Sequence, residues 1–170
     1  MVIDAVDHRN RPIGTIMRKD VFKSSLGFRT VHVFIFNSSG QLLVQQQSRK
    51  RDRAPLSWGS SVAAYLFAGE SYESAARRRV WQELGVKPGN LRLVGTVKTR
   101  DLGHDKFVGL VTGVWDGRFH FDHNHIEKLE FLAPQDIQRV MREGTWTFTP
   151  TFVSLFKFYR RNRGKSSPRS

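Results

Sequence analysis

The sequence predicts a single α+β domain in which strands supply most of the core and helices cover them. Most segments rich in β-branched and aromatic residues are short and bounded by turn residues, which is typical of strands. Helical signals are confined to the middle of the chain and to its last third. The length of 170 residues fits one domain, and 39% hydrophobic with 12% aromatic residues is enough for a core.

Short strands separated by polar turns account for most of the first half of the chain. The turn at residues 37–40 ends in Gly40, so we expect the strands on either side of it to form a hairpin. A polar loop at residues 48–58 contains Pro55, which favours a break between strands. The strands predicted in this half span residues 2–6, 13–17, 29–36, 41–47 and 60–67.

The clearest helix is predicted over residues 71–84. Ser71 can cap its first turn, and Gly85, followed by Pro88, can end it. Apolar side chains recur along it at near-helical spacing and give it one face that can pack on a sheet. These side chains are Ala75, Ala76, Val80 and Leu84.

The second half of the chain continues with strands and ends with two further helices. One helix is expected to open at residues 133–136 and to reach Met141, and a last helix is expected over residues 152–159. This order of elements is typical of a layered α+β fold. The strands predicted in this half span residues 91–99, 106–114, 119–121 and 129–132.

The composition excludes several classes of protein. The chain has no cysteine, which excludes disulfide scaffolds, thiolate metal sites and cysteine nucleophiles. No stretch approaches the length of apolar sequence that a membrane-spanning helix needs. Asp4 and Asp7 do not fit a secretory signal. We therefore expect a soluble, cytoplasmic protein with no membrane partner.

The charge of the chain favours anionic partners. It carries 28 basic and 15 acidic side chains, a formal charge of +13, which favours nucleotides, diphosphates or nucleic acid, although a basic surface can also serve solubility alone. Basic residues are enriched at the C-terminus. We expect a domain of residues 1–158 followed by a basic, flexible tail of residues 159–170, which could bind nucleic acid without sequence preference.

The segment from Ala64 to Val86 resembles the Nudix box, GX5EX7REUXEEXGU, in which U is aliphatic. The closing residues 83–86 (Glu-Leu-Gly-Val) set the register, so Glu70 falls on the first glutamate of the motif and Arg78 on its arginine. The N-terminal residues 7–18 resemble the branch of the family related to isopentenyl-diphosphate isomerase. The resemblance implies the Nudix fold, an α/β/α sandwich around a mixed β-sheet.

Two of the three glutamates that hold the metal in this family are replaced here. The three positions, spaced i, i+3 and i+4 on one helical face, are occupied by Arg79, Gln82 and Glu83. In the family, carboxylates at these positions hold Mg²⁺ or Mn²⁺, since hard divalent cations prefer anionic oxygen ligands. Gln82 keeps an amide oxygen, whereas Arg79 repels a cation and can pair with Glu83 four residues later. Ala64 replaces the first glycine of the box.

The resemblance implies roles for residues in and beyond the box. We expect Arg78 to organise the loop before the helix through a hydrogen bond to Glu70, and Glu83, Gln82 and Arg79 to form the catalytic face. Glu70 is also a candidate metal ligand. The full set of candidate metal ligands is Glu83, Glu70 and Glu127.

Candidate residues for substrate binding lie in the polar loop that precedes the box. Arg51 and Arg53 can bind a diphosphate, and Trp58 can either stack on a base or pack in the core. Glu127 ends the segment 120–127, which holds three imidazoles and could either form a metal site or be a polar hairpin end.

Three functions remain open at this stage. The first is a hydrolase that cleaves the pyrophosphate of a nucleoside diphosphate derivative by a metal-activated water, with activity weakened by the replaced glutamates and with ligands recruited from other segments. The second is an inactive Nudix fold that binds a nucleotide or diphosphate, with Arg79 supplying fixed charge in place of the metal. The third is a basic nucleic-acid-binding protein. Isomerase activity is not expected, because isomerases of the resembling branch use a cysteine in proton transfer. Many Nudix proteins form dimers, so a homodimer is among the expected partners.

Overall fold

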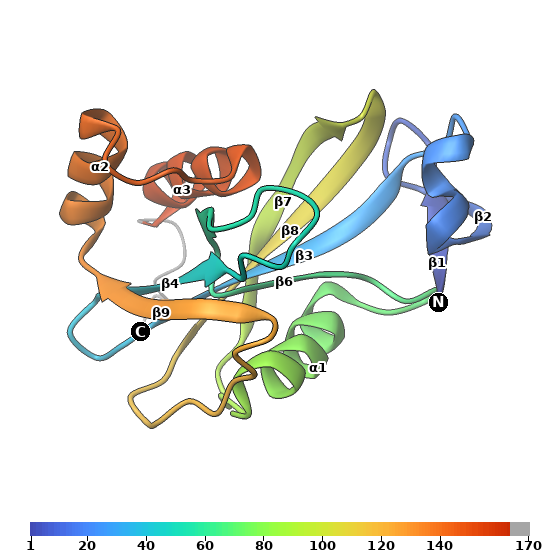
Figure 1. The fold of residues 1–170 in the computed structure, drawn as a ribbon. Helices are drawn as coiled ribbons and strands as arrows, with labels where there is room; N and C mark the ends of the chain where they lie inside the picture. Colours follow the sequence, from blue (N-terminus) through green and yellow to red (C-terminus); the bar gives the residue numbers. More distant parts are fainter. Residues whose placement is uncertain (164–170) are drawn as a thin grey trace.

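The structure is a computed structural model in which residues 1–163 are described. A mixed sheet of seven strands lies between helices in this part of the chain, and a separate pair of strands, β1 and β2, flanks one end of it (Figure 1). The strands are β1 (Val2–Val6), β2 (Pro12–Met17), β3 (Phe28–Phe36), β4 (Leu42–Gln47), β5 (Trp58–Gly59), β6 (Val62–Tyr65), β7 (Arg92–Asp101), β8 (His104–Val114) and β9 (Ile126–Leu132). The helices are the 3-10 helix η1 (Arg18–Lys23), α1 (Tyr72–Leu84), α2 (Pro134–Glu143) and α3 (Pro150–Asn162).

Strand β3 is the centre of the sheet. It pairs in parallel with β8, from Phe28 opposite Lys106 to Phe36 opposite Val114, and antiparallel with β6. The expected hairpin between β3 and β4 is present at its turn, but only Phe36 and Leu42 pair across it. The near-continuous apolar sequence of β3 explains its central position, because a strand that is buried on both faces is favoured at the centre of a sheet, with a partner strand on each side.

Helices cover both faces of the sheet and confirm the α/β/α sandwich (Figure 1). Val31, Val33 and Ile35 point to one face and pack in the cluster that contains the apolar side of α1. Phe34 and Phe36 alternate with them and pack in a second cluster, which contains Ile137 of α2 and Phe152, Leu155 and Phe156 of α3. The alternation of side chains along a strand thus divides the core into two layers.

The helical signals of the sequence are confirmed in the structure, with small shifts at the ends. Ser71 caps α1 by accepting a hydrogen bond from the Ser74 backbone N–H (3.1 Å), and Gly85 ends it in the left-handed conformation (φ 66°). Helix α3 continues to Asn162, so the predicted boundary of the tail at residue 159 falls inside a helix. The rest of that tail, from residue 164, lies outside the described residues.

Two other segments differ from the sequence expectation. Residues 119–121 were expected to form a strand, but they have no strand pairing, and Phe119 and Phe121 instead pack partly buried against the α1 core. Helix η1 was not predicted; it buries Val21 beneath the N-terminal strands. In the described part of the chain, no helix has both the length and the apolar character needed to cross a membrane.

Candidate functional site

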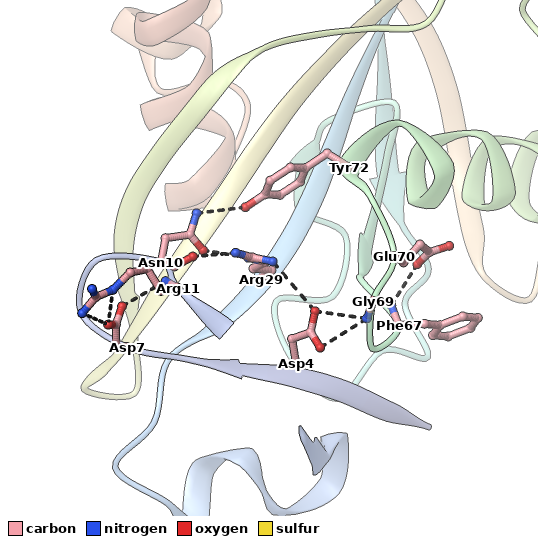
Figure 2. Close-up of polar contacts among 9 residues, drawn as sticks. All are labelled: Asp4, Asp7, Asn10, Arg11, Arg29, Phe67, Gly69, Glu70 and Tyr72. Atoms are coloured by element: carbon pink, nitrogen blue, oxygen red, sulfur yellow. Dashed lines mark hydrogen bonds and ion pairs between the residues drawn. The ribbon is translucent and has the colours of Figure 1, made fainter. Parts of the chain in front are cut away.

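Arg78 and Glu70 organise the loop that leads into α1. The Arg78 guanidinium donates from Nε to Glu70 Oε1 (2.9 Å) and from a terminal nitrogen to Glu70 Oε2 (2.8 Å). Glu70 Oε2 also accepts the Phe67 backbone N–H (2.8 Å; Figure 2). Burial works against ionisation of Glu70, but these hydrogen bonds hold its pKa below the ordinary value. Both carboxylate oxygens therefore accept hydrogen bonds within the loop, as the structural role for Glu70 requires.

The N-terminal strands hold the same loop from the other side (Figure 2). The carboxylate of Asp4 accepts the Gly69 backbone N–H (3.1 Å) and lies 3.8 Å from the Arg29 guanidinium. Arg29 in turn donates to Asn10 Oδ1 (2.7 Å), and Asn10 Nδ2 lies 3.5 Å from the Tyr72 hydroxyl at the start of α1. Residues 1–17 are thus structurally connected to the box, although they lie far from it in sequence.

Arg79 and Glu83 form an ion pair on the box face of α1. The i, i+4 spacing places the two side chains on one face, as the sequence analysis proposed. Glu83 is 9% exposed and also accepts a hydrogen bond from Gln45 Nε2 of β4 (3.1 Å). Arg79 Nε is buried, with no hydrogen-bond partner within residues 1–163. The pair leaves this face with no net charge.

The residues of the box face do not fit a divalent cation in this arrangement. Mg²⁺ and Mn²⁺ need several oxygen ligands, most of them anionic. The face offers one carboxylate, on Glu83, and one amide oxygen, on Gln82, beside the guanidinium of Arg79. Within residues 1–163, no group of three or more histidine, aspartate or glutamate side chains is arranged to hold a metal.

Glu127, the other candidate ligand, lies apart from the box and pairs with Arg49 (2.5 Å), which lowers its pKa. Two of its neighbours in the chain are closer to the box. Asp122 and His125, joined by a contact of 3.1 Å, line a cavity of about 120 Å³ together with Arg79, Gln82 and Glu83. In the segment 120–127, the His120 backbone N–H donates to the Leu84 carbonyl of the box (2.9 Å), and Asp122 and His125 share the small cavity with the box residues, whereas Glu127 does not line it.

A larger concavity, which we call the basin, lies on the sheet face beyond α3. It consists of two adjoining cavities of about 390 and 400 Å³, which share His32, Arg51, Ala63, Tyr65 and Lys106 in their walls. Basic residues predominate around it: Arg18, Arg51, Arg53, Arg78, Arg79, Arg100 and Lys106. Its acidic lining residues are Glu83 and Asp101. The basin therefore has a strong positive charge next to the box helix, which favours an anionic ligand.

The three residues predicted to bind substrate lie in different environments. Arg51 lines both cavities of the basin. Arg53 lines one of them and pairs with Asp101 (2.9 Å). Trp58 lines neither: it is 7% exposed and stacks on Trp146 with 4.1 Å between ring centroids. The structure thus corrects the assignment of Trp58, whose large apolar ring is buried in the core.

The floor of the basin is formed by residues that the sequence analysis missed. Lys106 of β8 and His32 of β3 lie on the same sheet face as Phe34, at the end that α3 leaves open. His32 Nδ1 contacts Ser60 Oγ (2.8 Å), and burial, with a smaller effect from the positive charge of Lys106, lowers the pKa of His32 to about 3. Burial also lowers the pKa of Lys106. Their only sequence signal is a polar residue within or next to an apolar strand.

Comparisons with known proteins agree with this fold. A model of the NUDIX domain family matches residues 28–152. An uncharacterised Nudix hydrolase from Pseudomonas aeruginosa is 27% identical over 76% of this chain and 77% of its own length. An isopentenyl-diphosphate Delta-isomerase from Nocardia farcinica is 26% identical over 97% of this chain and all of its own length.

Solved structures resemble the chain in the same way. The crystal structure of DR0079 from Deinococcus radiodurans superimposes with a TM-score of 0.78 at 25% identity, over 95% of this chain and 99% of that one. The Nudix domain of NrtR from Shewanella oneidensis, solved in complex with ADP ribose, has a TM-score of 0.64 at 15% identity, over 84% and 92% of the two chains. With the family model covering most of the sequence and the fold agreeing, this chain belongs to the Nudix family.

Proposed function

We propose that this protein binds the diphosphate group of a nucleotide derivative in the basin, without a divalent cation on the box helix, and that binding predominates over hydrolysis. The observation that carries the proposal is the ion pair between Arg79 and Glu83. It occupies the one carboxylate kept from the metal-binding set and places a fixed positive charge where the family has a cation. A guanidinium can bind phosphate oxygens directly, so it can replace part of the lost metal charge.

The surroundings of the pair support this assignment. Arg79 lines the basin, whose other cations come from η1, the loop 48–57, α1 itself, β7 and β8. Tyr65 lines both cavities, but its ring stacks on Phe28 (5.4 Å between centroids), and the Arg18 guanidinium lies 5.1 Å from its centroid. A ligand with an anionic diphosphate fits such a lining better than an apolar ligand does.

The experiment compares binding with turnover. ADP ribose, the ligand of the Shewanella oneidensis structure, serves as the first probe, in titration calorimetry with EDTA, with Mg²⁺ and with Mn²⁺. We expect binding in EDTA, with an affinity that added metal leaves within about three-fold, a difference of less than 1 kcal/mol. Nucleotide release is expected to stay at background for the natural chain in all three buffers.

A restored box tests the role of the replaced residues. The double variant Arg79→Glu with Gln82→Glu returns three carboxylates to one helix face, and we expect it to bind Mn²⁺ and to gain metal-dependent turnover. The matched control is Arg77→Glu, an exposed position on the same helix that lines neither cavity of the basin. Absence of ADP ribose and pyrophosphate binding by the natural chain in EDTA would refute the proposal.

A second candidate function is a metal-dependent hydrolase with recruited ligands. The observation that favours it is the small cavity in which Asp122 and His125 lie beside Gln82 and Glu83. If Arg79 moved aside, these residues would offer two carboxylates, an imidazole and an amide oxygen to Mg²⁺ or Mn²⁺. Metal-dependent turnover by the natural chain, lost in both Glu83→Ala and Asp122→Asn, would establish this candidate in place of the first.

A further inference from the structure

We propose that Arg51 and Lys106 form the primary phosphate-binding subsite of the basin, and that the arginines of the box helix are secondary to it. The inference rests on the proposed function and deepens it, because it names the residues that hold the ligand and the chemical group that they hold. That group is a phosphate or diphosphate of a small molecule.

The cations around the basin differ in whether a carboxylate pairs with them. Arg53, Arg78 and Arg79 are each neutralised by a carboxylate, those of Asp101, Glu70 and Glu83 respectively. Four other basin cations, Arg18, Arg51, Arg100 and Lys106, have no ion pair with any residue of the described chain, 1–163. A cation that already has a carboxylate partner must give it up or share it to bind phosphate, so unpaired cations attract the anion more strongly.

Arg51 and Lys106 also differ from the other cations in their position in the basin. Arg51 and Lys106 are the two cations that line both cavities of the basin, and they reach it from different elements. Arg51 is exposed and lies on the loop between β4 and β5, whereas Lys106 is half-buried on β8. A phosphate where the two cavities meet would lie within reach of both side chains.

The half-buried ammonium of Lys106 is short of hydrogen-bond acceptors. Among residues 1–163 its ammonium makes one hydrogen bond, to Thr151 Oγ1 of α3 (3.3 Å), although it can donate three. Desolvation of a cation costs free energy unless an anion compensates for it. A bound phosphate would supply both the missing charge and the missing hydrogen-bond acceptors.

The other ionisable groups that line the basin compensate Lys106 only in part: Asp101 favours its charged form, whereas burial and the charge of Arg53 work against it. His32 of β3 is buried and neutral, so it supplies no anion. Arg53 and Asp101 approach from the loop and from β7, but they are paired with each other. A proton on Lys106 therefore becomes more favourable when a phosphate binds, so the affinity of the natural chain should fall at alkaline pH.

Calorimetry with inorganic pyrophosphate in EDTA at pH 7 tests the subsite. We expect Lys106→Met and Arg51→Met each to weaken binding by about ten-fold or more, on the scale of a charge-assisted hydrogen bond. Lys106→Arg should recover binding to within about three-fold and reduce the loss of affinity at alkaline pH, because arginine stays protonated. The matched control is Lys98→Met on the neighbouring strand β7, where Lys98 pairs with Asp105 (2.9 Å) and lines neither cavity.

The outcomes separate this inference from the proposed function. If the natural chain binds pyrophosphate and both Lys106→Met and Arg51→Met bind it unchanged, the subsite is refuted while the proposed function stands. An equal loss in Lys98→Met would also refute it, because the effect would then be one of overall charge. No binding by the natural chain would overturn both proposals. Should Lys106→Met fail to fold by circular dichroism, Arg51→Met, on an exposed loop, decides the matter alone.

Discussion

Replacing Arg79 by methionine should destabilise the protein, because it leaves the buried carboxylate of Glu83 without its cation. Glu83 would keep one donor, the Gln45 side chain at 3.1 Å. Glu83→Gln should cost less, because glutamine keeps the shape and removes the buried charge. In the double variant no charge remains to be compensated, so its cost should be smaller than the sum of the two single costs.

The exposure of the pair sets the size of the effect. The side chains of Arg79 and Glu83 are 29% and 8% exposed, so the pair lies between a surface ion pair and a buried one. Surface pairs contribute about 0–1 kcal/mol, and removing one partner of a buried pair costs about 3–5 kcal/mol. We therefore expect about 2 kcal/mol for Arg79→Met and about 1 kcal/mol for Glu83→Gln, with a coupling of about 1 kcal/mol. The first value corresponds to a melting temperature lower by about 4–8 °C for a domain of this size.

Urea unfolding in EDTA, followed by tryptophan fluorescence and far-UV circular dichroism, measures these free energies of unfolding. Arg77→Met is the control on the same helix, and it should change the free energy of unfolding by no more than about 0.5 kcal/mol, as an exposed substitution does. If the costs of Arg79→Met and Glu83→Gln add to within about 0.3–0.5 kcal/mol, the two side chains do not interact, and the argument that their ion pair closes the box face is refuted.

Three further predictions concern the scaffold around the site. Asp4→Asn should weaken the connection between β1 and the loop at Gly69 and lower the free energy of unfolding by about 1 kcal/mol, because it removes the charge from the hydrogen bond and from the ion pair with Arg29. Hydrogen exchange of residues 67–71 should accelerate, and unchanged exchange would contradict the role of Asp4. Gly109→Ala should lower the melting temperature by several degrees, because the new Cβ would lie 2.2 Å from Tyr72 Cδ1. Adding Tyr72→Ala should recover part of the loss, and no recovery would show that the clash with Tyr72 is not its cause. The free energy of unfolding should fall as the pH drops from about 6.5 towards 3. Burial lowers the pKa of His32 to about 3, so in this pH range the unfolded chain binds a proton at His32 that the folded chain does not. His32→Gln should reduce the dependence of the free energy of unfolding on pH, by at most about 1.4 kcal/mol per pH unit, and an unchanged dependence in urea unfolding would contradict a neutral, buried His32.

The box helix shows how far local sequence determines structure. Ser71 and Gly85 mark the ends of α1, and the contact between Arg79 and Glu83 follows from their spacing, because cap and i, i+4 interactions involve residues within one or two turns. The pairing of Glu70 with Arg78 was expected from the resemblance to the Nudix box, and it is present.

The expectations that failed depended on contacts between distant segments. The large apolar ring that made Trp58 a candidate stacking residue also suits a core residue. In the structure it is buried against Trp146, 88 positions later. Similarly, nothing within residues 29–47 indicates that β3 pairs along its length with β8 and β6 and meets β4 only at one residue pair. Residues 119–121 have a strand-like composition, but their aromatic rings pack against the core cluster that contains α1.

The amino-acid sequence by itself determined the family, the box helix, the loss of the metal-binding carboxylates and the excess of positive charge, since all of these are carried by residue types and short spacings. Only the tertiary structure decided where that charge is concentrated. The parallel register of β3 and β8 pairs Lys106 with Phe28 and so places it on the same sheet face as His32, 74 positions earlier, and Arg51 reaches the same basin from a loop. Strand register is set by the packing of the whole sheet, so no local pattern could have placed these side chains together.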